Sequence, residues 1–328
     1  MPWRCPRCRG PLDQHDSTLN CAACAARYDV VAGIPDLRIP CPAWIDFEAD
    51  KAHARRVADA LESHSVETVV GDVFRARPGW SEARVQQRTR QILEGPGRAR
   101  QELATWLAPV ATGDRPLLEI GCGTGGLLAA LPTGREAIGV DVSMVWLVVA
   151  RRMLLDHGRR PVLAAAVAEA LPLPSDAVDA AVALDVVEHV GDLPKVLQEI
   201  DRVCAPGAFV ACATPNRFSL APEPHVGVWG VGWLPRRLQA RYVRWRSGEE
   251  YRFVSLLSPR EALRLAARHT RIDARAEAPP VPAEEIATFR GLRRRLALTY
   301  NRIHAVRPMA RLLLLVGPFF HLTGRKAG

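Results

Sequence analysis

The chain of 328 residues contains no long apolar run. No stretch approaches the roughly 20 apolar residues that a helix needs to cross a bilayer, so we expect no membrane-spanning helix. The N-terminal residues also lack the apolar core of a signal peptide, which predicts a cytoplasmic protein. A hydrophobic content of 48% with 24% charged residues is ordinary for a globular protein and argues against wholesale disorder.

Acidic residues are absent from the C-terminal part of the chain. Residues 286–328 contain eight Arg, one Lys and no Asp or Glu, which accounts for the whole formal net charge of +9. Because the first 285 residues are therefore neutral, the charge gives little support to a body that binds nucleic acid in general.

The same basic segment carries a short apolar run at residues 312–320. A basic helix beside an apolar stretch too short to span predicts a peripheral contact of residues 286–328 with anionic lipid, at the inner face of the membrane. The alternative is a terminal helix that packs its leucines onto the body and leaves its arginines in solvent.

Half of the eight cysteines lie in two Cys-x-x-Cys pairs near the N-terminus. In a reducing compartment such pairs indicate a metal before a disulfide, and two of them complete a tetrahedral zinc site. A segment this small buries too little apolar surface to fold without a cross-link such as a metal ion. We therefore predict a structural zinc ribbon, with four unligated cysteines as the alternative and with domain support or docking of a protein partner as its role. The predicted ligands are Cys5, Cys8, Cys21 and Cys24.

A glycine-rich turn follows the apolar run at residues 117–120. Strand, glycine turn and helix together bring a backbone close to a nucleotide-like ligand. Glu119 precedes the turn, and Asp141 stands 20 residues past Gly121, where an acid at the tip of the second strand accepts ribose hydroxyls. The glycine spacing also fits a dinucleotide-binding loop, so the turn alone does not name the ligand.

Strand and helix patterns alternate from residue 116 onward. This alternation predicts an α/β fold, doubly wound, with a mostly parallel sheet and helices on both faces. The strands are expected at residues 117–120, 136–140, 161–167, 178–184, 208–213 and 271–278. The predicted divisions are a ribbon at 1–39, a helical collar or lid at 40–112, the α/β domain at 113–278 with an acceptor lid at 216–251, and a basic-apolar tail at 279–328.

The ordered motifs resemble those of the seven-stranded, Rossmann-like S-adenosylmethionine-dependent methyltransferases. The resemblance rests on Glu119 with its glycine turn, on Asp141, on the run 168–172 and on residues 179–190, and it covers about half the chain. An acid two residues before the first glycine favours this family over a dehydrogenase. The cysteine pairs with residues 33–37 resemble the zinc ribbon associated with many methyltransferases.

This resemblance implies a site for S-adenosylmethionine. The glycine turn would approach the methionine part, Glu119 would order the turn and the amino group, and Asp141 would bind the ribose. Many relatives carry Asp where Val167 stands, so Glu169 or a main-chain carbonyl would take over its bond to adenine, or adenine recognition would be looser. The implied cofactor-binding residues are Glu119, Gly121, Cys122, Gly123, Gly125, Asp141, Val142, Val167, Ala168, Glu169 and Asp185.

Polar residues follow the fourth predicted strand, where the chemistry of methyl transfer would take place. Such a transfer needs alignment, exclusion of water and, for a weak nucleophile, removal of a proton. Asp185, Glu188 and His189 are the candidate catalytic residues, with His189 as general base because an ordinary imidazole pKa of about 6.5 suits neutral pH. The alternative is that Glu188 and His189 only begin a helix.

A metal-binding role for the same residues stays open. Asp185, Glu188, His189 and His225 are hard oxygen and imidazole donors. Their pattern is similar to that of ubiquinone-pathway O-methyltransferases, and more distantly to small-RNA 3′-terminal 2′-O-methyltransferases, some of which use a divalent ion. Asp185 replaces the glutamate usual at the first position, which departs from that ligand set.

Tryptophans and arginines interleave in residues 216–251, which we expect to shape the acceptor pocket. The leading hypothesis is methyl transfer to an oxygen of a small-molecule or lipid-linked acceptor. One alternative is an RNA methyltransferase that uses the ribbon and the arginine-rich lid, although the neutral body disfavours nucleic acid. Another is an inactive cofactor-binding scaffold, against which the intact Glu119 and Asp141 weigh.

Overall fold

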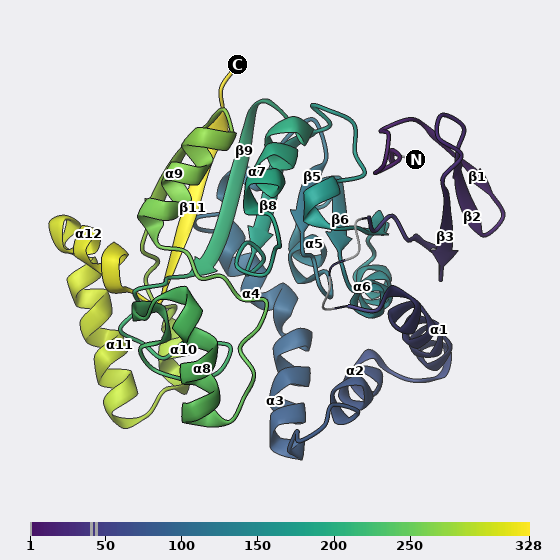
Figure 1. The fold of residues 1–328 in the computed structure, drawn as a ribbon. Coiled ribbons are helices and arrows are strands. Elements are labelled where there is room, and N and C mark those ends of the chain that lie inside the picture. The colour runs from purple at the N-terminus through teal and green to yellow at the C-terminus, as the bar shows by residue number, and fades with distance from the viewer. Residues whose placement is uncertain (1, 40–41, 43–44) are drawn as a thin grey trace. The chain divides into compact units, whose positions relative to one another are not determined.

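A computed structural model describes residues 2–39, 42 and 45–328, and its helices and strands are labelled in Figure 1. The chain forms two compact units. The first contains residues 1–183 and 198–209 together with residue 328, and the second contains residues 184–197 and 210–327. No helix among the described residues is long and apolar enough to cross a membrane.

The N-terminal segment of the first unit folds as a small antiparallel sheet with the order β1-β2-β3-β4. Leu19 and Tyr28 lie opposite each other in the register of β2 and β3, and both side chains are buried. The four strands are β1 (Leu12–His15), β2 (Thr18–Cys21), β3 (Arg27–Val31) and β4 (Ile34–Pro35).

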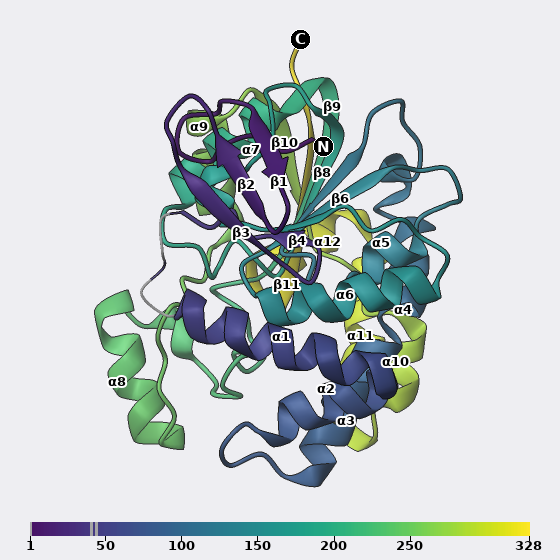
Figure 2. The ribbon, with the colours of Figure 1, turned by 90° about the vertical axis from the view of Figure 1, so that its right-hand side faces the viewer.

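Helices follow the ribbon, as the mixed polar and apolar periodicity predicts. The first three begin at side-chain caps, because Asp46, Ser65 and Ser81 each accept a hydrogen bond from a backbone N–H of the first helical turn. The first of these helices packs along α6 (Met144–Asp156), the helix that follows β6 (Ala137–Asp141) (Figure 2). The elements are α1 (Phe47–Ser63), α2 (Val66–Arg75), α3 (Glu82–Leu93), α4 (Gly95–Leu103) and η1 (Ala108–Val110).

A seven-stranded sheet with the order β10-β11-β9-β8-β5-β6-β7 confirms the predicted fold class. The pairs β5–β6, β5–β8 and β6–β7 are parallel, and β10–β11 is antiparallel. All four residues of β5 are buried, as expected for a central strand covered on both faces. The strands are β5 (Leu117–Ile120), β6 (Ala137–Asp141), β7 (Leu163–Ala165), β8 (Val178–Leu184), β9 (Cys204–Pro215), β10 (Ile272–Glu277) and β11 (Phe319–Lys326).

The remaining helices connect these strands. In the sequence they alternate with the strands up to β9. After β9, in the described part of the chain, three helices precede β10 and three more precede β11. They are α5 (Gly126–Ala130), α6 (Met144–Asp156), η2 (Ala168–Ala170), α7 (Leu193–Val203), η3 (Val231–Trp233), α8 (Arg236–Ser247), α9 (Pro259–His269), α10 (Ala283–Thr288), α11 (Gly291–His304) and α12 (Arg307–Val316).

The segment predicted as a tail contains a strand of the sheet that the sequence analysis did not assign. Strand β11 pairs antiparallel with β10, and the side chain of Phe320 is fully buried. Gly317 and Pro318 separate α12 from β11, so the apolar run 312–320 belongs to two elements. A helix–strand boundary inside one apolar run leaves no mark in its hydrophobicity, although the Gly-Pro pair is a turn signal.

Candidate functional site

The glycine turn after β5 adopts a backbone that side chains disfavour. Gly121, Gly123 and Gly125 have φ angles of 70°, 50° and 75°. A Cβ added at Gly123 would meet no atom within 4 Å, so the turn faces open space there. The left-handed backbone therefore explains why glycine stands at these positions, and the open space leaves room for a ligand against the backbone.

Asp141, at the end of β6, holds this turn. Its Oδ2 accepts a hydrogen bond from the N–H of Gly123 at 2.8 Å, and its Oδ1 accepts one from the N–H of Ser143 at 2.8 Å. Burial raises the pKa of the Asp141 carboxyl in spite of these donors. Since each oxygen keeps a further lone pair, the carboxylate is able to anchor the turn and still accept from ribose hydroxyls.

Glu119 is buried beneath the turn with an unsatisfied oxygen. Only 5% of the residue is exposed, and Oε2 has no hydrogen-bond partner among the described residues. The backbone N–H of Leu128 donates to the carboxylate, but burial, with Asp141 nearby, raises the pKa of Glu119 well above its usual range. A buried acceptor without a partner calls for one. The cationic amino group of S-adenosylmethionine fits this requirement.

The other predicted cofactor residues have different surroundings. Cys122 is buried, and a Cβ at Gly139 would lie 2.9 Å from its Sγ, so its side chain faces the core and only its backbone is available to a ligand. The N–H of Ala166 donates to the carbonyl of Asp141, which brings the start of the 167–169 segment to the end of β6. Val167 and Ala168 are buried there, beside the intermediate Glu169.

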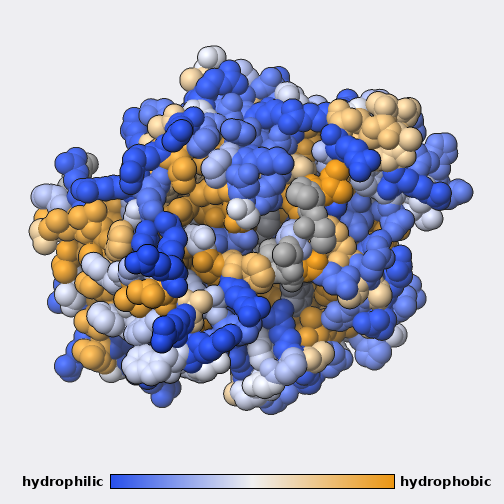
Figure 3. All heavy atoms as spheres, viewed as in Figure 1, coloured by the Kyte–Doolittle hydropathy of each residue, from blue (hydrophilic) through white to orange (hydrophobic). Residues whose placement is uncertain are grey.

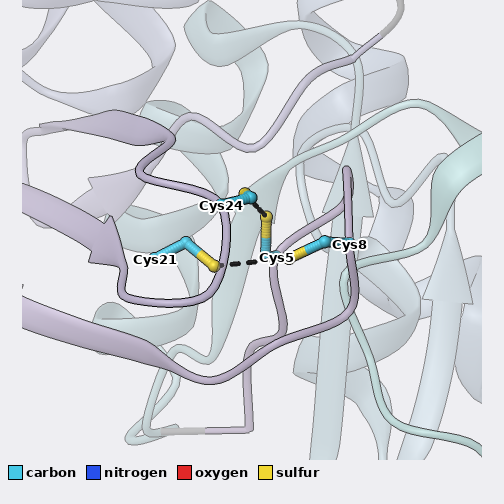
Figure 4. A group of neighbouring side chains, drawn as sticks. All are labelled: Cys5, Cys8, Cys21 and Cys24. Atoms are coloured by element: carbon cyan, nitrogen blue, oxygen red, sulfur yellow. Dashed lines mark hydrogen bonds between the residues drawn. The ribbon is translucent and has the colours of Figure 1, made fainter.

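The four N-terminal cysteines converge (Figure 4). The Sγ atoms of Cys5 and Cys24 lie 3.6 Å apart, those of Cys8 and Cys21 lie 3.4 Å apart, and all four lie within 4.8 Å of one another. Zn–S bonds of about 2.3 Å in a tetrahedron place sulfur atoms about 3.8 Å apart. The donor set and its spacing therefore fit a structural zinc ion.

In the second unit, Glu188 is a buried carboxyl with one free oxygen. The residue is 0% exposed, its Oε2 accepts a hydrogen bond from Oγ1 of Thr214 at 3.0 Å, and its Oε1 has no partner among the described residues. Burial raises the pKa of Glu188 to about 7. The neighbouring Asp185 has a φ of 54°, and its carboxylate is not among the ligand atoms that converge with Glu188. Much of the residue's surface is exposed, yet burial of the carboxyl raises the pKa of Asp185 against the opposing effect of His225.

His189 and His225 face each other at this carboxyl. Their Nε2 atoms lie 3.1 Å apart, while Nδ1 of His189 contacts the carbonyl of Phe253 at 3.3 Å. Nδ1 of His225 contacts Oε1 of Glu223. Because a carbonyl and a carboxylate only accept hydrogen bonds, each Nδ1 is assigned its proton, and each neutral ring then presents an Nε2 lone pair to the other.

Two facing lone pairs need a positive charge between them. A shared proton supplies it when one ring is an imidazolium, and a metal cation supplies it when both rings are neutral. Burial lowers the pKa of His225, but the hydrogen bond to Glu223 outweighs this effect and the pKa is raised. The pKa of His189 is lowered, by burial and by the neighbouring His225. Glu188, His189 and His225 offer three ligand atoms within 4.8 Å of one another.

Sequence reasoning missed two residues of this cluster. Glu223 is 4% exposed and accepts hydrogen bonds from the backbone N–H groups of His225 and Val226 as well as contacting the imidazole. Tyr251 is 6% exposed, and its hydroxyl has no partner among the described residues. The Glu-x-His spacing at 223–225 could have indicated that Glu223 contacts the imidazole of His225. No sequence pattern near Tyr251 indicates that it lies close to this cluster.

Comparison with known proteins matches residues 118–212 to the family model described as a methyltransferase domain. A probable S-adenosylmethionine-dependent methyltransferase of Mycolicibacterium smegmatis is 34% identical over 113 residues, covering 33% of this chain and 41% of the relative. A ubiquinone biosynthesis O-methyltransferase of Chelativorans sp. is 34% identical over 128 residues, covering 37% and 49%. The chain thus spans about half the length, or less, of these curated relatives.

Among solved structures, phosphoethanolamine N-methyltransferase 2 of Haemonchus contortus, with phosphomonomethylethanolamine and S-adenosylhomocysteine, aligns with a TM-score of 0.47 at 18% identity. The alignment covers 70% of this chain and 52% of that one. The fold of this chain is therefore assigned from its own strand order and not from this alignment.

Proposed function

We propose, from the methyltransferase domain that residues 118–212 form, that the protein transfers a methyl group from S-adenosylmethionine to an oxygen of a small-molecule or lipid-linked acceptor. The observation that carries this proposal is the buried, unpaired Oε2 of Glu119 beneath a glycine turn that Asp141 anchors. A cationic, ribose-bearing ligand satisfies both acids at once.

When bound, S-adenosylmethionine supplies a methyl group on a sulfonium centre. Glu119 would accept from its amino group, and Asp141 would accept from the ribose while holding Gly123. Residues 167–169 would flank the adenine, with no carboxylate at Val167 to bind it. In this way the backbone of the glycine turn would orient the donor, and Glu119 in its ionised form would provide the charge that favours a cation.

The acceptor side is proposed at the chain segment that follows β8. Ala183 of β8 is in register with Ile120 of β5, and Asp185 comes two residues after Ala183 along the chain. His189, whose Nδ1 is turned to the Phe253 carbonyl, presents Nε2 as a proton acceptor, and its lowered pKa keeps it neutral. As the acceptor oxygen forms its bond to the methyl carbon, the bond from that carbon to the sulfonium sulfur would break and release S-adenosylhomocysteine, while the proton of the acceptor hydroxyl would pass to this nitrogen.

Residues 216–251 support the idea of an acceptor lid. They contain a small core of their own around Val228, Val231 and Val243, against which Tyr251 packs. Trp229, Trp233 and Trp245 stay largely exposed around that core. Exposed tryptophans on a packed segment are suited to an apolar or planar acceptor.

A divalent cation is proposed as the alternative to this general base, because an ion between the facing Nε2 atoms of His189 and His225 would occupy the lone pair that otherwise accepts the proton. Glu188, His189 and His225 would hold the ion, which would supply charge to lower the pKa of an acceptor hydroxyl. Glu223 and the Phe253 carbonyl would orient the two imidazoles, an arrangement usual for metal-binding histidines. Exposed Asp185 would not belong to this ligand set.

A peripheral contact with anionic lipid is proposed for α11 and α12. Large apolar side chains are exposed on both helices, and they gather over α12 at the left of Figure 3. Arg293, Arg294 and Arg295 are exposed on α11. The exposed apolar side chains are Leu292, Leu296, Leu298, Met309, Leu312 and Leu315.

The proposed activity is tested by incubating the protein with S-adenosylmethionine labelled in its methyl group and separate pools of small molecules, lipids and RNA. We expect label in the small-molecule or lipid pool, and its loss in a Glu119→Gln variant. Label confined to RNA would favour the RNA methyltransferase instead. Binding of the donor with no labelled product in any pool would support the inactive scaffold.

A further inference from the structure

The zinc ribbon is joined to the edge of the sheet in the first unit. Directly after β4, Asp36 forms a parallel bridge with Ala165 of the edge strand β7, and the N–H of Leu37 donates to the Ala165 carbonyl at 2.8 Å. Leu37 is fully buried. The ribbon therefore covers a sheet edge whose backbone groups would otherwise lack partners.

The next residue, Arg38, carries a guanidinium with no exposed surface. Its Nε and Nη2 donate to the two oxygens of Asp36 at 2.7 and 2.8 Å. Its Nη1 donates to Oδ2 of Asp50 at 2.6 Å and to the carbonyl of Val142 at 2.8 Å. The Phe47 ring stacks 4.1 Å from the guanidinium. A buried charge is tolerated only with such extensive pairing, so the arrangement is sensitive to any lost partner.

The partners of Arg38 hold the turn that follows Asp141. Val142 is a direct partner, and Oδ2 of Asp50 also accepts from the N–H of Met144 at 2.8 Å. Between them, the N–H of Ser143 donates to Asp141, which in turn accepts from Gly123. Hydrogen bonds, joined through the peptide backbone of residues 142–144, thus lead from the end of the ribbon to the glycine turn.

We infer that Arg38 is a positioning residue that ties the zinc-binding ribbon to the site for S-adenosylmethionine through the Asp141 turn. The inference rests on the proposed function and adds a dependence of donor binding on the ribbon. A zinc ion on the four converging cysteines would hold the two knuckles together and so fix β3 and β4, which place Asp36 and Arg38. Loss of zinc then loosens the 142–144 turn and weakens donor binding, although no cysteine contacts the donor.

The test measures the affinity for S-adenosylhomocysteine by calorimetry, together with zinc content, in the full chain. Arg38→Met is expected to weaken binding about tenfold while zinc stays at one per chain. Arg9→Gln is the matched control, because it also removes an ion pair of the ribbon, to Glu199, but one with no link to Asp141. Equal affinity of Arg38→Met and the unaltered protein would overturn the inference.

A second measurement separates positioning from general destabilisation. If Arg38 acts through Asp141, the Arg38→Met/Asp141→Asn double variant should bind no more weakly than Asp141→Asn alone. Fully additive losses would show that Arg38 acts by another route and would contradict the inference. If Arg38→Met does not fold, Asp50→Asn takes its place in this cycle, because it alters the carboxylate shared by Arg38 and Met144.

A third measurement needs no substitution. Hydrogen exchange of the peptide covering residues 142–146 is compared before and after zinc is removed by a chelator. Faster exchange in the zinc-free protein, with weaker binding of S-adenosylhomocysteine, is expected, and unchanged exchange would contradict the inference. Failure of the unaltered, zinc-loaded protein to bind S-adenosylhomocysteine would instead overturn the proposed function.

Discussion

The N–H of Gly123 lies 2.8 Å from Oδ2 of Asp141, which ties the turn after β5 to the end of β6. The carboxylate of Asp141 thus accepts a hydrogen bond from the glycine turn and still has a lone pair available for the ribose. The same residue is also the point at which the Arg38 network reaches the donor site.

Replacing Asp141 by Asn is expected to weaken binding of S-adenosylhomocysteine by about tenfold to a hundredfold. The amide supplies only one acceptor oxygen for two backbone donors, and a lost hydrogen bond to a charged group costs about 1.5–3 kcal/mol. Calorimetry checks this, with Glu136→Gln as the control, since Glu136 is an exposed acid just before the same strand. Equal losses in both variants would contradict a specific role for Asp141.

Donor binding is expected to strengthen as pH rises. The pKa of Glu119 is raised well above its usual range by burial, so below that pKa the carboxyl is neutral and a cationic amino group gains no ion pair. Binding a cation favours the ionised carboxylate, and affinity therefore increases with pH until Glu119 is ionised in the free protein.

Affinity for S-adenosylhomocysteine measured by calorimetry between about pH 5.5 and 8.5 tests this dependence. Glu119→Gln removes the titrating group and should give a flatter profile with weaker binding at high pH. Parallel profiles for the two proteins would show that another group is responsible.

The zinc-loaded protein is expected to bind one Mn²⁺ at Glu188, His189 and His225. Mn²⁺ prefers oxygen and imidazole ligands over the thiolates of the ribbon, so the two metals do not compete. Glu223→Gln should weaken Mn²⁺ binding about 10- to 100-fold by releasing the His225 ring, and Glu188→Gln should weaken it further.

Paramagnetic resonance of free Mn²⁺ measures this binding, and His64→Asn is the control because that histidine is exposed on the first unit. If the unaltered protein binds no Mn²⁺, the two histidines share a proton instead. In that case the cluster acts without a metal.

The exposed leucines of α12 are expected to support binding to anionic vesicles. Leu312→Ser/Leu315→Ser should lower the fraction of protein that floats with vesicles rich in phosphatidylglycerol, and high salt should lower it for the unaltered protein. Leu155→Ser, at an exposed leucine of α6, is the matched control. Flotation that is equal in all three proteins would remove the proposed lipid contact.

Local motifs allowed much of the fold to be predicted, and with it the contact between the glycine turn and Asp141. Two neighbouring strands place Glu119, the glycine turn and Asp141, so the spacing of these residues in the sequence is enough to predict that they lie close together. The four cysteines could be predicted for the same reason, because each pair lies within one knuckle.

Residues that meet through tertiary packing were not predictable in this way. Arg38 lies 104 positions from Val142, and Glu223 lies 35 positions from Glu188, so no spacing rule connects them. Strand β11 was not predicted because its first residues continue an apolar run that begins in α12. Asp185 was predicted as a catalytic, cofactor-binding and possible metal-binding residue from its place beside Glu188. Its carboxylate is not among the ligand atoms that converge with Glu188, so only the metal-binding part of that prediction is affected.

Calorimetric titration of the unaltered, zinc-loaded protein with S-adenosylhomocysteine tests the central proposal most directly. The account predicts saturable binding of one molecule per chain, which Glu119→Gln and Asp141→Asn weaken. Absence of binding by a folded protein with its zinc in place would contradict it.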